Sequence, residues 1–592
     1  MTARPGRRVL AVVAALLLCA AARPAVAVDL SLRDEPLRLD VTETLLFSWH
    51  LDNMNRTYAD DRYGEVQSRL NLALAYRRWL FSVRVDTSGY FNTPSCDAAG
   101  NCTAPSPPDH ADRWPALSPG DLRNRYEFRG VDHSGPMYLP ERLALTYAGP
   151  GLEVTLGDHY VSLGRGLVLS LRKVDELGSD TDLRGGRVVV RRGPFSGTVV
   201  GGVTNIVNID EATGRTAPDP LDGIVGGRAE VRLRDTLALA AQGAAIIFHE
   251  KAVPNAATDD MTLLGGASAE LPRLGTLGSG YVEYAHASRV LNQVGYPGDA
   301  LYGALTTYRG RLSLLLEGKY YSGFPSVGTS LKNANEFSTI RYNNPPTVER
   351  VLAEMDSVSP ILYVGGGRLR ADYKLSSAVT GFASYGYFYD WTDPNARLDI
   401  HDPYAGVTVA WQEHRSHLAV SGGVRYARER ENTDPSYAHP AQAHSTDAHF
   451  ELVVAQALTR RLSLELGGRH RYRQKRLFEL DRWNEGEWAL GLRWSPRLIA
   501  AVGYEYTTEP ALERPPCCDP ATNPGACYQG QTLCDNYHRL GYVNGQIAWT
   551  FRPGSTVRLF VGGQRGGLRC VSGVCRQFPP FQGLKAEATI RF

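Results

Sequence analysis

Residues 583–592, GLKAEATIRF, alternate between apolar and polar side chains. Leu584, Ala586, Ala588, Ile590 and Phe592 fall on one face, and Lys585, Glu587, Thr589 and Arg591 fall on the other. A period of two over this length predicts a β-strand whose two faces meet different environments. The apolar face includes the terminal aromatic residue, so the strand is expected to continue to the end of the sequence.

The other end of the sequence has the pattern of a secretory signal peptide. Arg4, Arg7 and Arg8 precede an apolar core at 9–22, and Ala25-Val26-Ala27 provides a small-residue cleavage site. We therefore exclude residues 1–27 from the fold and expect an exported mature chain, 28–592. Cys19 follows Leu18 within the apolar core, where a lipoprotein cysteine needs a small residue before it, so no lipid anchor is predicted.

Alternating segments recur along the mature chain, and their connections are short and long in turn. Turns such as 495–497 and 552–554 alternate with long connections at 91–137, 163–181, 323–360 and 509–538. Beyond the signal peptide, no window holds the roughly 18 consecutive apolar residues that a membrane helix needs. Counting back from 581–592 to 38–50 gives about 24 strands (22–26), each long enough to cross a membrane when tilted. The pattern predicts an all-β fold, a transmembrane antiparallel up-and-down barrel. No plug domain is expected, because only about ten residues precede the first strand, fewer than a globular domain needs.

The alternation also assigns the two faces of the predicted wall. A charge on the lipid face costs about 2–4 kcal/mol at mid-membrane, so the charged side of each strand should face the lumen. The lumen-facing basic residues selected as pore candidates are Arg69, Arg84, Arg228, Arg232, Arg368, Arg370, Arg469 and Arg471. Fixed positive charge along a pore favours anions. The alternative is that these arginines form cross-strand ion pairs that stiffen the wall.

One long connection, 163–180, is too apolar for a loop surrounded by water. Its leucine-rich run LVLSL at 167–171 precedes the charged run RKVDE at 172–176. A barrel of about 24 strands would be a wide hole unless something occludes it. We expect this segment to fold inward and to place Arg165, Arg172, Lys173, Asp175 and Glu176 at a constriction. The alternative is an additional hairpin in the wall.

Eight cysteines remain in the mature chain, and all of them fall in long connections. Export favours disulfides over metal binding, and Cys517-Cys518 does not resemble the CxxC knuckle of zinc sites. The close pairs Cys96/Cys102 and Cys570/Cys575 are the expected local bridges, whereas Cys517, Cys518, Cys527 and Cys534 allow three connectivities. We predict disulfides, no metal site and no cofactor.

Candidate acid–base pairs are few. Asp158-His159 and His401-Asp402 combine a carboxylate with an imidazole, but neither lies beside a nucleophile motif such as GxSxG. A histidine next to an aspartate more often has a structural or interfacial role than a catalytic one. No catalytic residue is therefore assigned, and the chain is not expected to be an enzyme.

The signal peptide, the strand–turn rhythm over 38–592 and the terminal Phe592 resemble those of Gram-negative outer-membrane β-barrels. In that class the last strand, ending in Phe, is the signal for the barrel-assembly machinery. Ile590 and Phe592 match its apolar spacing, whereas Glu587 stands where a glycine is often found. The runs GDHYVSLGRGLVLSLRKVDELG and DTDLRGGRV are similar to an uncharacterised family of bacterial outer-membrane barrels, which implies no substrate.

This resemblance implies location in the outer membrane, with lipid and the barrel-assembly machinery as partners. We expect a porin-like channel or passive transporter for polar solutes, including anionic ones, and no nucleic-acid partner. Two alternatives stay open. One is a non-transporting structural or adhesion barrel whose disulfide-stapled loops bind a partner, and the other is an outer-membrane enzyme.

Overall fold

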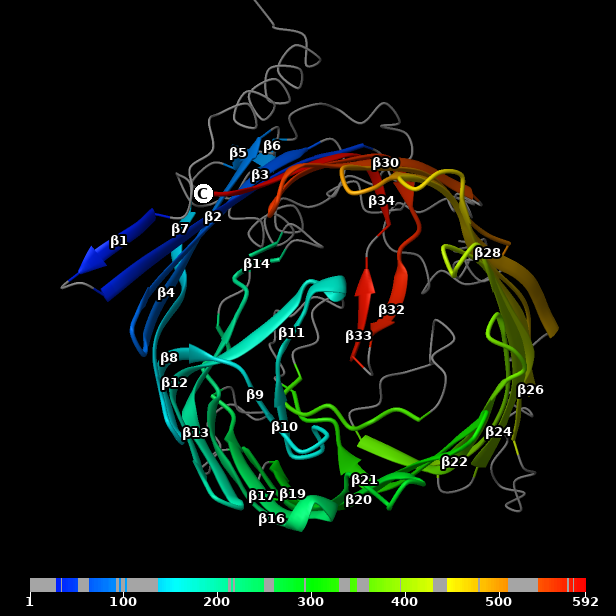
Figure 1. Ribbon diagram of the computed structural model, residues 1–592. Coiled ribbons are helices and arrows are strands. Elements are labelled where there is room, and N and C mark those ends of the chain that lie inside the picture. Colours follow the sequence, from blue (N-terminus) through cyan, green and yellow to red (C-terminus); the bar gives the residue numbers. More distant parts are fainter. Residues whose placement is uncertain are drawn as a thin grey trace, which may run out of the picture.

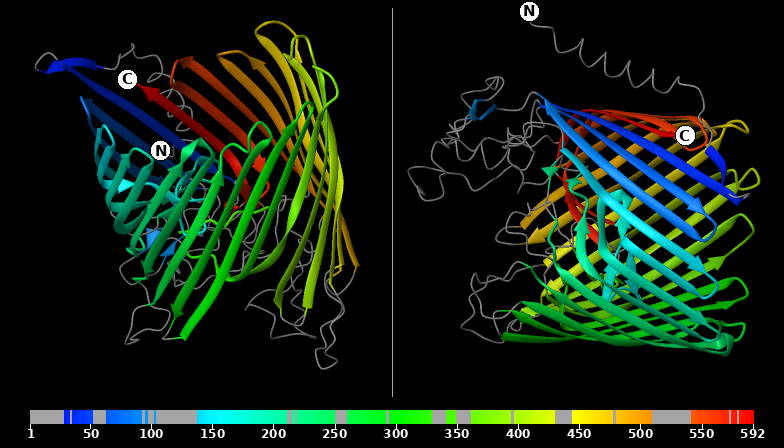
Figure 2. Two further views of the ribbon diagram at one scale, coloured as in Figure 1. Left: turned by 60° about the horizontal axis from the view of Figure 1, so that its bottom comes forward. Right: turned by 90° about the vertical axis from the view of Figure 1, so that its left-hand side faces the viewer.

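The computed structural model is a closed ring of tilted antiparallel strands (Figures 1 and 2). It describes residues 28–592 except 33–34, 52–62, 92–94, 97–101, 104–136, 211–214, 217–218, 250–259, 292–293, 329–340, 349–360, 394–395, 430–443, 477–479, 509–540, 572–573 and 579. The signal peptide and Cys517, Cys518, Cys527 and Cys534 lie outside the described residues.

In the described part of the chain 24 strands form the wall, which confirms the predicted fold class and strand number. The strands are β2 (Glu35–His50), β3 (Gly64–Tyr76), β4 (Trp79–Phe91), β7 (Met137–Gly149), β8 (Leu152–His159), β12 (Ser179–Arg192), β13 (Phe195–Ile206), β16 (Gly223–Leu233), β17 (Leu237–Ile247), β18 (Met261–Leu271), β19 (Gly278–Leu291), β20 (Val294–Arg309), β21 (Leu312–Pro325), β22 (Ile361–Lys374), β23 (Val379–Asp393), β24 (Ala396–Trp411), β25 (Ser416–Glu429), β26 (His444–Ala457), β27 (Leu462–Arg476), β28 (Leu480–Trp494), β29 (Leu498–Thr507), β30 (Gly541–Arg552), β31 (Ser555–Gln564) and β34 (Phe581–Arg591). Each pairs with its neighbours in antiparallel register, as a hairpin meander requires.

The first and last wall strands close the ring. β2 pairs with β34 from Thr42 opposite Arg591 to His50 opposite Gly583, and the backbone N–H of Phe592 donates to the Val41 carbonyl (2.9 Å). The alternating strand that ends the sequence is therefore the closing strand. A short strand, β1 (Val28–Leu32), pairs with the part of β2 that extends beyond the end of β34. Closure leaves no open edge between β2 and β34.

The wall has an apolar outer face, as β30 illustrates. Val543, Ile547 and Trp549 point outward and are 57%, 47% and 42% exposed, whereas Tyr542 and Asn544 point inward and are buried. At the end of the barrel that carries the short turns, the rings of Trp79 and Tyr147 lie side by side, with centroids 5.0 Å apart. An apolar outer band with aromatic residues near its edge is the surface that a lipid bilayer covers.

The connections alternate in length around the ring, as the sequence pattern predicts. Tight turns such as Arg77–Arg78 and residues 553–554 lie at one end of the barrel together with the C-terminus (Figure 2). The long connections lie at the other end and carry small hairpins: β5 (Ser95–Cys96) with β6 (Cys102–Thr103), and β32 (Gly567–Val571) with β33 (Val574–Phe578). No helix among the described residues is long and apolar enough to cross a membrane.

The backbone register of these hairpins bears on the cysteine prediction. Cys96 lies opposite Cys102, and Cys570 lies opposite Cys575. Cysteines at facing positions of an antiparallel pair have the spacing that a disulfide needs. The bridges themselves stay a prediction, as do the cleavage of 1–27 and the absence of a separate plug domain.

Adjacent residues of β30 provide a matched test of the two faces. Ile547→Arg places a charge on the outer face near the middle of the strand and should lower the free energy of unfolding in bilayers by about 2–4 kcal/mol. Gln546→Arg points into the lumen and should cost much less. Urea unfolding in liposomes measures both variants. Equal destabilisation by the two would contradict the assignment of faces.

Candidate functional site

Part of the chain between β8 and β12 folds into the ring instead of extending from its rim. This first inner segment, residues 160–178, contains β9 (Val161–Leu163), β10 (Leu169–Leu171), β11 (Lys173–Val174) and the 3₁₀ turn η2 (Asp175–Leu177). β9 and β10 pair only with each other, so they are not an additional hairpin of the wall. Figure 1 shows β9, β10 and β11 within the circle of strands.

The leucine-rich run of this segment packs against the inner surface of the wall. Leu163, Leu167, Val168, Leu169 and Leu171 are almost completely buried. Their wall neighbours are small or apolar residues on the luminal side of β13 to β20: Val200, Ile224, Ala244, Ile246, Leu264, Ala285 and Ala300. Where this run packs, the luminal face is apolar and not charged as expected, although Glu283 and Arg228 of the same arc also face inward. Apart from Gln242, both faces of β17 are apolar, because one faces lipid and the other faces the inner segment.

A buried carboxylate anchors the tip of the first inner segment to the wall. Glu283 of β19 is fully buried, and its Oε2 accepts the backbone N–H of Arg165 (2.8 Å) and the hydroxyl of Tyr281. Its Oε1 accepts the side-chain amide of Gln242, whose oxygen in turn accepts Arg228 Nη1 (2.7 Å). Hydrogen bonds to a carboxylate are stronger than neutral ones, so this contact holds the tip in place.

The anchor needs glycine beside it. Gly164 has a φ of +58°, and a Cβ there would lie 2.6 Å from Glu283 Oε1. A side chain at this position would combine an unfavourable backbone conformation with a clash at the anchoring carboxylate. The turn GRG at 164–166 is therefore shaped to bring the Arg165 backbone onto Glu283.

A second inner segment, residues 326–328 and 341–348 between β21 and β22, interlocks with the first. The Asn343 side chain is fully buried, and its amide donates to the carbonyls of Leu167 (3.1 Å) and Pro325 (3.0 Å). Its oxygen accepts the backbone N–H of Val327 (2.8 Å). Ser170 N–H also donates to the Tyr342 carbonyl (2.7 Å), so backbone and side chain both join the two segments.

The second inner segment is tied to the wall by its own buried carboxylate. Tyr342 donates its hydroxyl to Oδ2 of Asp222, the residue before β16. Asp222 Oδ1 accepts the backbone N–H of His249 (2.8 Å), beyond the end of β17. Both Tyr342 and Asp222 are buried. The two inner segments and the wall from β13 to β21 therefore form one packed body.

The opposite arc of the wall sends a third element inward. The β32–β33 hairpin lies inside the ring (Figure 1), and β32 contacts η2 of the first inner segment. Just before it, Arg565 donates its backbone N–H to Glu505 (2.9 Å) and its guanidinium to Glu485 (3.1 Å). Elements from both sides of the barrel thus meet inside it.

The wall arginines proposed as pore residues all have carboxylate partners. The pairs are Arg69–Asp86 (3.4 Å), Arg84–Asp86 (2.6 Å), Arg228–Glu230 (3.2 Å), Arg232–Glu230 (3.5 Å), Arg368–Glu317, Arg370–Asp372 (2.8 Å), Arg469–Glu487 (2.9 Å) and Arg471–Glu485 (3.2 Å). This pairing favours the interpretation that they stiffen the wall.

Arg165 differs from the wall arginines. Its side chain is exposed inside the barrel, with its guanidinium 4.8 Å from the centre of the Tyr281 ring, and it forms no ion pair with a described residue. Lys173 pairs with Asp175, and Arg172 is partly buried. Glu176 lies in η2, and its side chain is outside the described part of the structure.

The two candidate acid–base pairs have structural contacts. Asp158 forms an ion pair with Arg184 (2.8 Å) and accepts the Leu143 backbone N–H (2.6 Å), while His159 Nδ1 lies 3.0 Å from the Gly157 carbonyl. His401 shares a hydrogen bond with the Tyr385 hydroxyl (2.8 Å). Among the described residues, no group of three or more His, Cys, Asp or Glu side chains could hold a metal ion.

Comparison with known proteins does not assign a family. No protein-family model and no curated protein matches the sequence. Solved structures with a similar shape include the P pilus usher PapC translocation pore (10% identity, 94% of this chain and 99% of that chain, TM-score 0.38). The siderophore receptor PirA from Pseudomonas aeruginosa is 9% identical, covers 94% of this chain and 80% of its own, and has a TM-score of 0.44. OccK2 (OpdF) from the same organism, in complex with glucuronate, is 11% identical, covers 68% of this chain and 95% of its own, and has a TM-score of 0.34.

The geometry of the chain itself identifies the surface that meets a membrane. A closed antiparallel ring satisfies its backbone groups, and its outer face is apolar. The protein is a membrane-spanning β-barrel.

The anchoring residues Glu283, Asn343 and Asp222 were not identified from the sequence. Glu283 lies in the run YVEYAH, where alternation predicts only a lumen-facing carboxylate. Asn343 and Asp222 lie in connections, where no periodic pattern exists. The one available signal was the apolar run at 167–171, which requires a partner surface without specifying which residues form it.

Removing the charge of Glu283 should loosen the first inner segment. Each hydrogen bond to a charged group contributes about 1.5–3 kcal/mol, so Glu283→Gln should raise amide exchange at 163–171 roughly tenfold or more. Hydrogen-exchange mass spectrometry of the reconstituted protein measures this. Glu230→Gln is the control, because Glu230 pairs with Arg228 and Arg232. Unchanged exchange at 163–171 would contradict the anchoring role.

Proposed function

We propose that this barrel is an outer-membrane channel or passive transporter for polar solutes, and that the inner segments narrow its lumen. The observation that carries the proposal is the interlock of the two inner segments through Asn343, inside a wall of 24 described strands. Barrels of 16–18 strands already enclose an aqueous channel, so a wider one needs such an obstruction to remain selective.

The charged part of the luminal surface is an argument for hydrated, polar solutes. From β21 to β28 the inner face includes ion pairs such as Arg368–Glu317 and Arg469–Glu487. Charged side chains that are partly exposed inside a barrel require water around them. A hydrated surface of this kind favours polar over apolar solutes.

A preference for anions is supported by Arg165 and not by the paired wall arginines. A paired arginine contributes little net field, because its carboxylate cancels the charge at short range. Arg165 is exposed at the tip of the first inner segment and has no ion-pair partner among the described residues. A positive charge fixed at a narrow point attracts anions and repels cations.

Planar-bilayer recording tests the channel proposal. Asn343→Ala removes three hydrogen bonds, including the one to the Leu167 carbonyl that joins the second inner segment to the first, so the variant should conduct more than the wild type. Asn544→Ala is the control, because Asn544 is similarly buried and bonds the Gly563 carbonyl in the wall (3.2 Å). No measurable conductance after deletion of 163–171 from a folded barrel would refute the proposal.

Reversal potentials in a salt gradient test the anion preference. Wild type should favour chloride over potassium, and Arg165→Gln should shift the reversal potential towards zero or to the cation side. Arg165→Lys retains the charge and should keep the wild-type sign. A wild-type preference for cations would rule out the proposed role of Arg165.

A further inference from the structure

The wall has an interrupted strand ladder between β7 and β12. β7 pairs with β8 over only six residue pairs, from Ala144 opposite Gly157 to Gly149 opposite Leu152, the shortest ladder in the described ring. β8 then leaves the wall at His159 and continues into the first inner segment. Beyond that point β11 pairs with β12, at Lys173 opposite Asp180. The described edge of β7 at 137–143 is therefore without a partner strand on this side.

Side chains from three other strands take the place of the missing strand. Asp158 of β8 accepts the Leu143 backbone N–H (2.6 Å). The Glu141 carbonyl accepts Arg184 of β12 (3.1 Å) and Asn205 of β13 (3.1 Å). These bonds satisfy edge groups that a neighbouring strand would satisfy elsewhere in the barrel. We call this contact, between the 137–143 edge of β7 and β8, β12 and β13, the seam.

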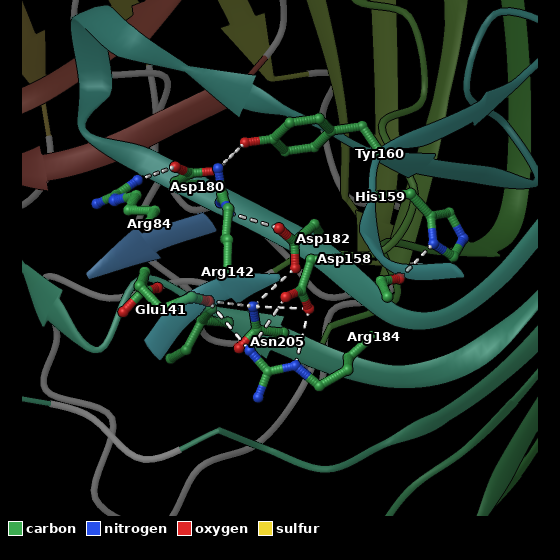
Figure 3. Close-up of polar contacts among 12 residues, drawn as sticks. Arg84, Glu141, Arg142, Asp158, His159, Tyr160, Asp180, Asp182, Arg184 and Asn205 are labelled. Atoms are coloured by element: carbon green, nitrogen blue, oxygen red, sulfur yellow. Dashed lines mark hydrogen bonds and ion pairs between the residues drawn. The ribbon is translucent and has the colours of Figure 1, made fainter. Parts of the chain in front are cut away.

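A layer of ion pairs joins the two sides of the seam (Figure 3). Arg142 of β7 contacts Asp180 and Asp182 of β12, the latter at 2.7 Å, and Arg84 of β4 reaches Asp180 at 3.3 Å. Tyr160, at the start of the first inner segment, donates to Asp180 (2.7 Å) and contacts Arg142. Burial and the charge of Asp180 raise the pKa of the Tyr160 hydroxyl.

This closure differs physically from a strand ladder. Separating two paired strands exposes many backbone groups at once, which lipid does not tolerate. Separating the seam exposes charged side chains and a few backbone groups of β7, which water or polar head groups can solvate. Glu141 Oε1 and Asn205 Oδ1 are already buried there without a hydrogen-bond partner among the described residues, so the closed seam is incompletely satisfied.

The seam has an apolar surface on its outer side and opens towards the lumen on its inner side. Leu143 and Leu156 are exposed on the outer face, directly below the point where β8 leaves the wall. On the inner side, the chain continues from Tyr160 into the first inner segment. An amphipathic molecule has the matching polarity, because its polar head fits the charged seam while its hydrocarbon chain stays along the outer face.

We propose that the seam is a lateral opening through which the head group of an amphipathic, lipid-like molecule passes between the outer membrane and the lumen. This function goes beyond conduction of polar solutes. It uses the same barrel but a different route, through the wall between β7 and β12.

Photo-crosslinking to lipid tests the proposal. The protein, with p-benzoylphenylalanine in place of Tyr160, is reconstituted into liposomes that contain phosphatidylethanolamine fluorescently labelled on its head group. Tyr302 is the matched control position, because its hydroxyl also donates to a carboxylate, Glu317 (3.1 Å), and it faces the lumen beside unbroken ladders. We expect fluorescent lipid adducts with the residue at position 160 and no adducts with the residue at position 302.

A second variant separates passage through the seam from incidental lipid contact. Asp182→Asn removes one charge that holds Arg142, so it should increase the adduct at position 160 and leave position 302 unchanged. A difference in SDS-gel migration between unheated and heated samples verifies that each variant is a folded barrel. Equal adducts at both positions, no adduct at 160 in a folded barrel, or an adduct at 160 that Asp182→Asn does not change would overturn the proposal. Bilayer conductance, recorded on the same samples, reports on the channel proposal independently.

Discussion

The structure depends on the requirement that every backbone N–H and C=O in a membrane finds a partner within the protein. A ring of antiparallel strands meets this requirement only if the last strand pairs with the first. The pairing of β34 with β2 achieves this, from Gly583 opposite His50 to Arg591 opposite Thr42. Most other features of the barrel are consequences of that closure or responses to its size.

The size of the ring imposes a second requirement, which is that the lumen must be partly filled. A barrel of 24 described strands has more internal space than side chains from the wall can fill. Two inner segments occupy part of that space, and they are held by buried polar groups as well as by apolar packing. Glu283, Asp222 and Asn343 each accept or donate several hydrogen bonds, so moving one segment would leave buried polar groups without partners.

The same strand that supplies the first inner segment also interrupts the wall. When β8 turns inward at His159, β7 loses its partner, and Asp158, Arg184 and Asn205 satisfy its edge. The obstruction of the lumen and the seam are thus two results of one departure from regular strand pairing. They lie next to each other, with Tyr160 belonging to both.

The sequence by itself determined the strands, their number and their outward face, because period-two alternation and turn residues are local properties. Residues 583–592 predicted the terminal strand, and the short and long connections predicted the two ends of the barrel. The apolar run at 167–171 indicated that this connection needs a partner surface. These inferences required only neighbours along the chain.

Only the tertiary structure decided which surfaces meet across the ring. Alternation predicted that the charged side of each strand faces the lumen, whereas the luminal side of β17 is apolar except for Gln242, because the first inner segment covers it. It could not reveal that Asn343 bonds the Leu167 carbonyl 176 residues away, or that Asp180 pairs with Arg84 96 residues away. Such contacts depend on the curvature of a closed wall and on where one strand leaves it, and neither is encoded in a local pattern.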